Sequence, residues 1–315
     1  MRNIIRFYNQ NRMKIFIILL AIIFIFVIIQ LLNSLEAEKV ENKNSNVNTA
    51  EVQEKNYDKE SESIVSGKDV SGTYKQEFGN LIDSFLSYCK NHEPEKAYEL
   101  LSQDCKNVLY PTLEFFKEAY YNDIFSGDKM YSFQSWTSRD TYIYLVKIYD
   151  NILSSGKVNS DYIQDYISVV EEDAGYKLNI KNYLGTISFN SKASEQDIEI
   201  EVKKAEIYMD YQLYTVKITN NSKNPILLDT KSKTNSLYIR EDSDSKFEAA
   251  TYEKLEEDLI VDANKNKTIE FKFYDSYREG IEITELVFSD IIKDYNKYLE
   301  DKGDYSERIK IVIDL

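Results

Sequence analysis

The chain has 315 residues, with 39 Lys and Arg, 54 Asp and Glu, and a net charge of −15 at pH 7. This negative excess argues against nucleic-acid binding, which depends on neutralising phosphates, and against broad adhesion to anionic lipid or wall polymers. One histidine and two cysteines leave few side chains for nucleophilic or metal-dependent catalysis.

An apolar run near the N-terminus, residues 15–32, is interrupted only by Gln30. At 1.5 Å per residue it spans about 27 Å as a helix, close to the thickness of the hydrocarbon core of a bilayer. Four basic residues precede the run: Arg2, Arg6, Arg12 and Lys14. The positive-inside rule therefore places residues 1–14 in the cytoplasm and the rest of the chain outside.

A cleaved signal peptide is the alternative reading of this segment. Its apolar region would be about 7–15 residues long and would end at a small-x-small site. The run here is longer and is followed by Leu32-Asn33-Ser34-Leu35-Glu36-Ala37. We therefore predict an uncleaved single-pass transmembrane helix in the cell membrane, with the C-terminal domains extracellular.

Residues 33–72 are rich in Glu, Lys, Asn and Ser and show no apolar period. This composition is typical of a disordered linker. About 240 residues remain after it, enough for one large or two ordinary domains, and we expect two.

The segment 73–184 begins with helical periodicity and then changes to period two. Apolar residues recur at helical spacing over 74–89, and two further amphipathic stretches follow Pro94 and Pro111. Four alternating segments come next, at 130–137, 142–149, 162–171 and 176–180. Three helices followed by an antiparallel sheet predict an α+β domain with the helices on one face of the sheet.

The segment 186–315 reads almost entirely as strand. Ile198, Ile200 and Val202 alternate with charged residues, and similar alternation recurs over 214–218 and 269–273. Short strands at this spacing, separated by polar turns, predict an all-β sandwich. One short helix is expected near 291–299, before a last strand at 309–313. The whole chain is thus predicted to be α+β.

Both parts resemble known families. Residues 97–106, 110–117 and 165–172 are similar to membrane-anchored Gram-positive domains of the nuclear transport factor two-like fold, a resemblance that covers 73–184. Residues 214–222 and 269–273 resemble an immunoglobulin-like sandwich common on exported Gram-positive proteins, over about 186–315. The first resemblance implies a cone whose concave sheet face can hold a ligand, with Asp–His or Asp–Tyr pairs in the enzymes of the fold.

That resemblance supplies no catalytic residue here, because the only histidine, His92, falls in a predicted turn between helices. Cys89 and Cys105 lie on apolar helix faces, and we expect both to be buried free thiols, with a disulfide as the alternative if the second helix ends early. The sequence has no P-loop, dinucleotide-binding or zinc motif, so no cofactor and no metal are predicted.

A set of aromatic residues in the first domain is the candidate pocket lining: Tyr131, Phe133, Trp136, Tyr142, Tyr144, Tyr162 and Tyr166. The alternative is that these rings form the sheet core, with their hydroxyls at its rim.

Together these features predict a non-enzymatic, single-pass cell-envelope protein that binds a protein or peptide partner outside the membrane. One alternative is a scaffold component of a conjugation or type IV secretion apparatus, since such machines use proteins with one anchor and an outside domain of this cone fold. A third is small-molecule binding or catalysis in the cone pocket.

Overall fold

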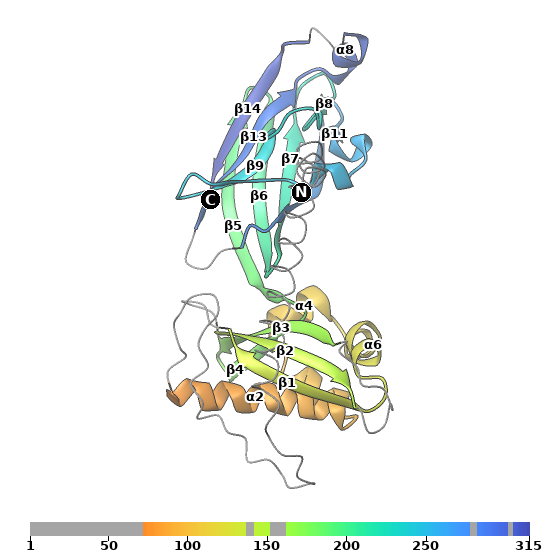
Figure 1. The fold of residues 1–315 in the computed structure, drawn as a ribbon. Coiled ribbons are helices and arrows are strands. Elements are labelled where there is room, and N and C mark those ends of the chain that lie inside the picture. The colour runs from red at the N-terminus through yellow and green to blue at the C-terminus, as the bar shows by residue number, and fades with distance from the viewer. Residues whose placement is uncertain (1–71, 137–141, 152–161, 278–281, 302–304) are drawn as a thin grey trace, which may run out of the picture. The chain divides into compact units, whose positions relative to one another are not determined.

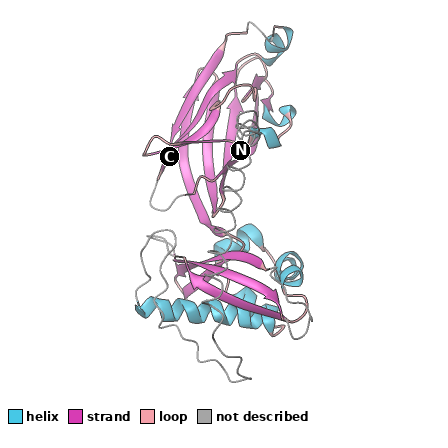
Figure 2. Cartoon of the chain, in the orientation of Figure 1, coloured by secondary structure: helices cyan, strands magenta, loops and turns pink. Residues whose placement is uncertain are grey.

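The computed structural model describes residues 72–136, 142–151, 162–277, 282–301 and 305–315. The predicted cytoplasmic tail and membrane span lie outside these residues, and so does the predicted linker 33–72 apart from its last residue, Gly72, which begins the first helix. Within the described ranges, no helix has the length and apolar character needed to cross a bilayer. The described chain combines helices with antiparallel sheets, so the prediction of an α+β protein is confirmed (Figures 1 and 2).

The first helix, α2 (Gly72–Lys90), buries one stripe of its surface. Phe78, Ile82, Phe85 and Cys89 recur at helical spacing and are fully buried, as the sequence pattern predicts. This stripe forms part of a hydrophobic core between helices and sheet, called the helix–sheet core below.

The predicted second helix is broken into α3 (Pro94–Glu99) and α4 (Gln103–Leu109). The break is stabilised from far along the chain, because the Leu178 N–H donates to the Leu100 carbonyl and the Ser102 N–H donates to the Leu178 carbonyl. The Ser102 hydroxyl then caps α4 by accepting a hydrogen bond from the Cys105 N–H at 2.9 Å. The expectation of one continuous helix was therefore wrong at this point.

The third helix starts as α5 (Leu113–Phe116), widens into the π-helical turn η1 (Lys117–Tyr121) and ends as α6 (Asn122–Ile124). The Thr112 side chain caps its first turn. Phe116, Tyr120 and Ile124 are buried, so the predicted apolar face is present although the π turn was not predicted.

The first sheet has four antiparallel strands in sequence order: β1 (Lys129–Ser135), β2 (Tyr142–Asp150), β3 (Ile163–Glu172) and β4 (Gly175–Asn179). Their bounds lie close to the predicted segments. Buried residues of one sheet face join the helix–sheet core, among them Tyr144, Val146, Ile148, Ile167 and Val169. The helices therefore cover one face of this sheet, as predicted.

The rest of the chain forms two further antiparallel sheets. One has the order β12-β7-β6-β5 and consists of β5 (Tyr183–Glu195), β6 (Ile198–Tyr208), β7 (Tyr211–Asn220) and β12 (Lys265–Tyr274). The other contains β8 (Ile226–Leu227), β9 (Leu237–Glu241), β10 (Lys246–Glu248), β11 (Ile260–Val261), β13 (Ile283–Ile292) and β14 (Arg308–Asp314). Residues of both sheets share one hydrophobic core, the two-sheet core, in which the rings of Phe271 and Phe288 lie 5.7 Å apart.

Three short helical segments, η2 (Thr251–Glu253), η3 (Glu256–Leu259) and α8 (Tyr295–Glu300), interrupt these strands. The helix predicted near 291–299 begins later than expected. Ile291 and Ile292 pair with Ile309 and Arg308 as part of β13, and Asp294 caps the helix instead.

Strand β5 contributes to both cores, since Tyr183 belongs to the helix–sheet core and Leu184 to the two-sheet core. The domain boundary predicted between 184 and 186 thus falls inside a strand. The division into two domains at this point stays a prediction.

Candidate functional site

The seven aromatic residues proposed as a pocket lining do not gather at one place. Four of them, Tyr131, Phe133, Tyr142 and Tyr144, pack into the helix–sheet core. The Tyr142 ring lies 4.7 Å from Phe78, and the Tyr131 hydroxyl donates to Asp83 at 3.1 Å. These contacts favour the alternative reading, in which the rings are core residues.

The other three lie elsewhere. Trp136 and Tyr166 pack edge to face at 5.4 Å and join the two-sheet core. Tyr162 is 49% exposed, with the Lys147 ammonium 4.6 Å above its ring. His92, the only histidine, lies in the turn between α2 and α3 as predicted, with its Nδ1 2.7 Å from the Tyr121 hydroxyl.

A buried carboxylate in β3, Asp165, was missed by the sequence analysis. Its oxygens accept hydrogen bonds from the Asn182 N–H at 3.0 Å, the Lys181 N–H at 3.1 Å and the Tyr120 hydroxyl at 3.1 Å. Burial raises the pKa of Asp165 to about 6, although all three donors favour its charged form.

These contacts identify a structural role for Asp165. Lys181 and Asn182 both have positive φ, at 60° and 61°, and form the tight turn between β4 and β5. The carboxylate therefore stabilises a turn of unusual backbone geometry by accepting from both of its central N–H groups. Burial also raises the pKa of the neighbouring Cys105 thiol to about 12, so that this cysteine is no nucleophile at neutral pH.

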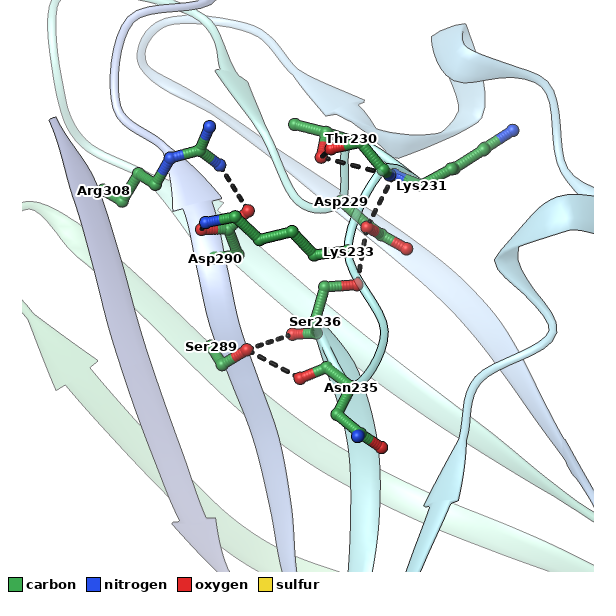
Figure 3. A network of polar contacts seen from close by, with 10 residues as sticks. Asp229, Thr230, Lys231, Lys233, Asn235, Ser236, Ser289, Asp290 and Arg308 are labelled. Carbon is green, nitrogen blue, oxygen red and sulfur yellow. Dashed lines mark hydrogen bonds and ion pairs between the residues drawn. The ribbon is translucent and has the colours of Figure 1, made fainter. Parts of the chain in front are cut away.

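A second network of polar contacts stabilises the loop between β8 and β9 (Figure 3). Asp229, which is 2% exposed, accepts from the Lys231 N–H at 2.8 Å and from the hydroxyls of Ser236 and Thr251 at 2.7 and 2.5 Å. The Ser289 hydroxyl donates to the carbonyl of Asn235 at 2.8 Å. The loop is thereby held against β13.

The same network contains two ion pairs that share one buried carboxylate, that of Asp290. Asp290 accepts from the Lys233 ammonium at 2.9 Å and from the Arg308 guanidinium, so that its two oxygens meet two cations (Figure 3). Both buried carboxylates accept hydrogen bonds from donors of the protein. The network thereby orders the loop.

A cavity of about 480 Å³ lies at one end of the two-sheet core and is called the mouth pocket here. It is bordered by the first part of β5, by β6 and β7, and by the start of β13. Residues used in the argument below are Thr186, Ile187, Phe189, Gln212, Tyr214 and Glu282. Its size falls within the range of about 300–1,000 Å³ that is typical of ligand pockets.

The inner wall of the mouth pocket is mainly apolar, and the polar atoms in it form hydrogen bonds with other atoms of the protein. The Phe189 ring stacks on Tyr214 at 6.0 Å, and the Tyr214 hydroxyl donates to the Gln212 side chain at 3.1 Å. The Gln212 amide nitrogen in turn donates to the Ser276 carbonyl at 2.9 Å. Among the described residues, Glu282 is the only charged one that lines the pocket, and Ile187 is 50% exposed.

Backbone irregularities shape this part of β5. The pairing with β6 shifts between Tyr183 and Gly185 and again between Ser188 and Ser191, so that two bulges bracket the lining segment. Gly185 has a φ of 153°, inside the region that favours glycine. The only sequence signal for the pocket was this glycine within a strand pattern, which is compatible with a bulge.

Among the residues that the structure describes, the lining of the mouth pocket includes no Cys, His or Lys, and its one carboxylate is that of Glu282. Across the part of the chain that the structure describes, no group of three or more His, Cys, Asp or Glu is arranged to hold a metal ion.

Comparisons of the chain with protein-family models, with curated proteins and with solved structures find no match.

Proposed function

We propose that the chain is a non-enzymatic, membrane-anchored cell-envelope protein whose external part binds a protein or peptide partner at the mouth pocket. The observation that carries the proposal is the pocket itself: a cavity of about 480 Å³ with an apolar wall, whose lining includes no Cys, His or Lys among the described residues.

The membrane anchor and its orientation rest on the apolar run 15–32 and on the basic residues before it. The proposal extends to the fold families. Helices on one face of a four-stranded antiparallel sheet suit the nuclear transport factor two-like resemblance of the first part. Two antiparallel sheets around one core suit the immunoglobulin-like resemblance of the second.

A macromolecular partner fits this pocket better than a small ligand held by polar groups. The amide of Gln212 and the hydroxyl of Tyr214 are already bonded to protein atoms, so neither offers the precise polar contact that small-ligand sites use. Ile187 adds exposed apolar surface at the edge, where a partner chain would cover it.

Site-specific photocrosslinking of the full chain in its own membrane tests the proposal. A benzophenone amino acid at position 187 should give a discrete adduct with one protein. The matched control is position 163, because Ile163 is also an exposed isoleucine in a strand and is 40% exposed. Absence of an adduct at 187, or the same adducts at both positions, would contradict binding at the mouth pocket.

A further inference from the structure

We infer that Asp104 of α4 and Asn179 of β4 are positioning residues of the mouth pocket: they hold the start of β5 in the conformation that lines it. Neither residue lines the pocket itself. This inference rests on the proposed function, because it concerns the site at which a partner is proposed to bind.

The segment that these residues hold is the first bulge of β5. The pairing with β6 shifts between Tyr183 and Gly185, so that Leu184 is the extra residue of the bulge. Leu184, Gly185 and the next residue, Thr186, all line the mouth pocket. The conformation of residues 183–186 therefore determines where one wall of the pocket lies.

Asp104 binds this bulge at both ends through one oxygen. Its Oδ2 accepts hydrogen bonds from the Tyr183 hydroxyl at 2.5 Å and from the Thr186 N–H at 2.9 Å. The hydroxyl oxygens of Tyr183 and Thr186 lie 2.6 Å apart, within hydrogen-bond distance of each other. A single side chain of α4 thus fixes the separation of the two ends of the bulge.

The carbonyl groups of the bulge accept hydrogen bonds from two further side chains. The Asn179 amide nitrogen donates to the Leu184 carbonyl at 2.8 Å, and the Ser168 hydroxyl of β3 donates to the Tyr183 carbonyl at 3.4 Å. The Asn179 amide oxygen accepts in turn from the hydroxyl of Ser102, the residue that caps α4. Ser102, Ser168 and Asn179 are at most 1% exposed. Buried groups of this kind have no water to replace a lost partner, so the network favours one conformation of the bulge.

The contacts from α4, β3 and β4 supply what the pairing with β6 lacks at this point. An extra residue locally disrupts the ladder of a strand pair, so the ladder alone holds a bulge less firmly than a regular strand. Removal of the Asp104 carboxylate takes the acceptor from the Thr186 N–H and from the Tyr183 hydroxyl together. The segment that lines the pocket should then open more often, while the rest of the sheet stays closed.

Amide hydrogen exchange of the full chain in detergent micelles tests the positioning without any partner. Asp104→Ala should speed exchange over residues 184–189 about tenfold or more, whereas exchange over 213–218, in the inner strand β7, should match that of the parent. Asp104→Asn should restore slow exchange over 184–189, because both hydrogen bonds go to one oxygen and Asn keeps one. Failure of this rescue would overturn the assigned hydrogen-bonding role.

Asp83→Ala is the matched control. Asp83 is also a half-buried aspartate on a helix, and it accepts a hydrogen bond from a tyrosine hydroxyl, that of Tyr131 in β1, at 3.1 Å. Its removal should leave exchange over 184–189 unchanged. Unchanged exchange in Asp104→Ala, or an equal increase in Asp83→Ala, would overturn the inference.

Tyr183→Phe is the second variant, for use if Asp104→Ala does not fold. It removes one of the two donors to Asp104 and keeps the ring, which packs at 5.3 Å from the ring of Tyr208. We expect severalfold faster exchange over 184–189 in this milder variant. The same exchange as in the parent would contradict the positioning role.

Photocrosslinking connects the positioning to binding. With the benzophenone at position 187, Asp104→Ala should give severalfold less adduct than the parent, and Asp104→Asn should give a yield close to that of the parent. An equal yield in Asp104→Ala would overturn the inference, because binding would then not depend on the held bulge. Absence of the adduct in the parent would instead overturn the proposed function, and the exchange measurement would still decide whether Asp104 positions the bulge.

Discussion

At the residue scale, Asp165 shows how one buried group couples the fold to pH. Its folded pKa of about 6 lies above the ordinary value of 3.8, because burial outweighs three hydrogen-bond donors. The folded state therefore holds the proton more tightly than the unfolded state between these two values. The contribution of this group to the free energy of unfolding is fully present below about pH 4. It is lost as pH rises through about 6, and the loss amounts to about 3 kcal/mol.

We expect Asp165→Asn to remove this pH dependence. The variant lacks the titrating group and also one hydrogen-bond acceptor, so its free energy of unfolding should be lower than that of the parent at pH 4.5. This difference between variant and parent should be smaller at pH 7.5. Urea unfolding of the external part at the two pH values measures it. A difference that is the same at both values would contradict a raised pKa of Asp165 in the fold.

Cys89 and Cys105 are both buried free thiols, as their helical spacing predicted. Burial raises the pKa of both, which keeps them protonated and unreactive at neutral pH. We expect a thiol reagent to label neither cysteine appreciably in the native protein and both in urea. Rapid labelling of either without denaturant would show that its helix opens readily.

At the element scale, β5 is the segment on which the division of the chain depends. The Thr186 N–H and the Tyr183 hydroxyl both bond to Asp104 of α4, and the ring of Tyr183 lies 5.3 Å from that of Tyr208 in β6. A cut between Leu184 and Thr186 separates Thr186 from Asp104 and Tyr183 from Tyr208, whereas the hydrogen bond between Tyr183 and Asp104 stays within the first fragment.

We therefore expect fragments 73–184 and 186–315 each to unfold cooperatively, but at a lower temperature than residues 73–315 together. Thermal unfolding followed by circular dichroism compares the three. If neither fragment folds alone while 73–315 does, the boundary or the independence of the two parts is wrong.

The elements show where sequence reasoning succeeds. Strand and helix positions were predicted because burial follows a local period, as in the stripe of α2 from Phe78 to Cys89 and the alternation of β7. The break between α3 and α4 was missed because it depends on Leu178, which is more than 70 residues away from Leu101.

The mouth pocket was missed for a similar reason. It depends on two bulges in β5 whose positions are defined only by the pairing with β6. The sequence places the seven aromatic residues in or beside strands of one sheet. The alternating pattern does not show that Trp136 and Tyr166 join a different core from Tyr142 and Tyr144.

At the scale of the whole molecule, we propose that a membrane anchor tethers an external binding surface. A tether raises the local concentration of that surface near envelope partners, to about the millimolar range for short flexible linkers. We expect residues 73–315, released from the membrane, to fail to replace the full chain in a deletion strain. Full complementation by the soluble part would show that tethering is not needed.

The central claim is that a partner binds the mouth pocket outside the membrane. The most direct measurement is photocrosslinking at position 187 in intact protoplasts, followed by protease added from outside before lysis. We expect a single protein adduct that the external protease removes, with no such adduct at position 163. An adduct at 187 that is fully protected until the membrane is lysed would contradict the external location, and absence of any adduct at 187 would contradict the site.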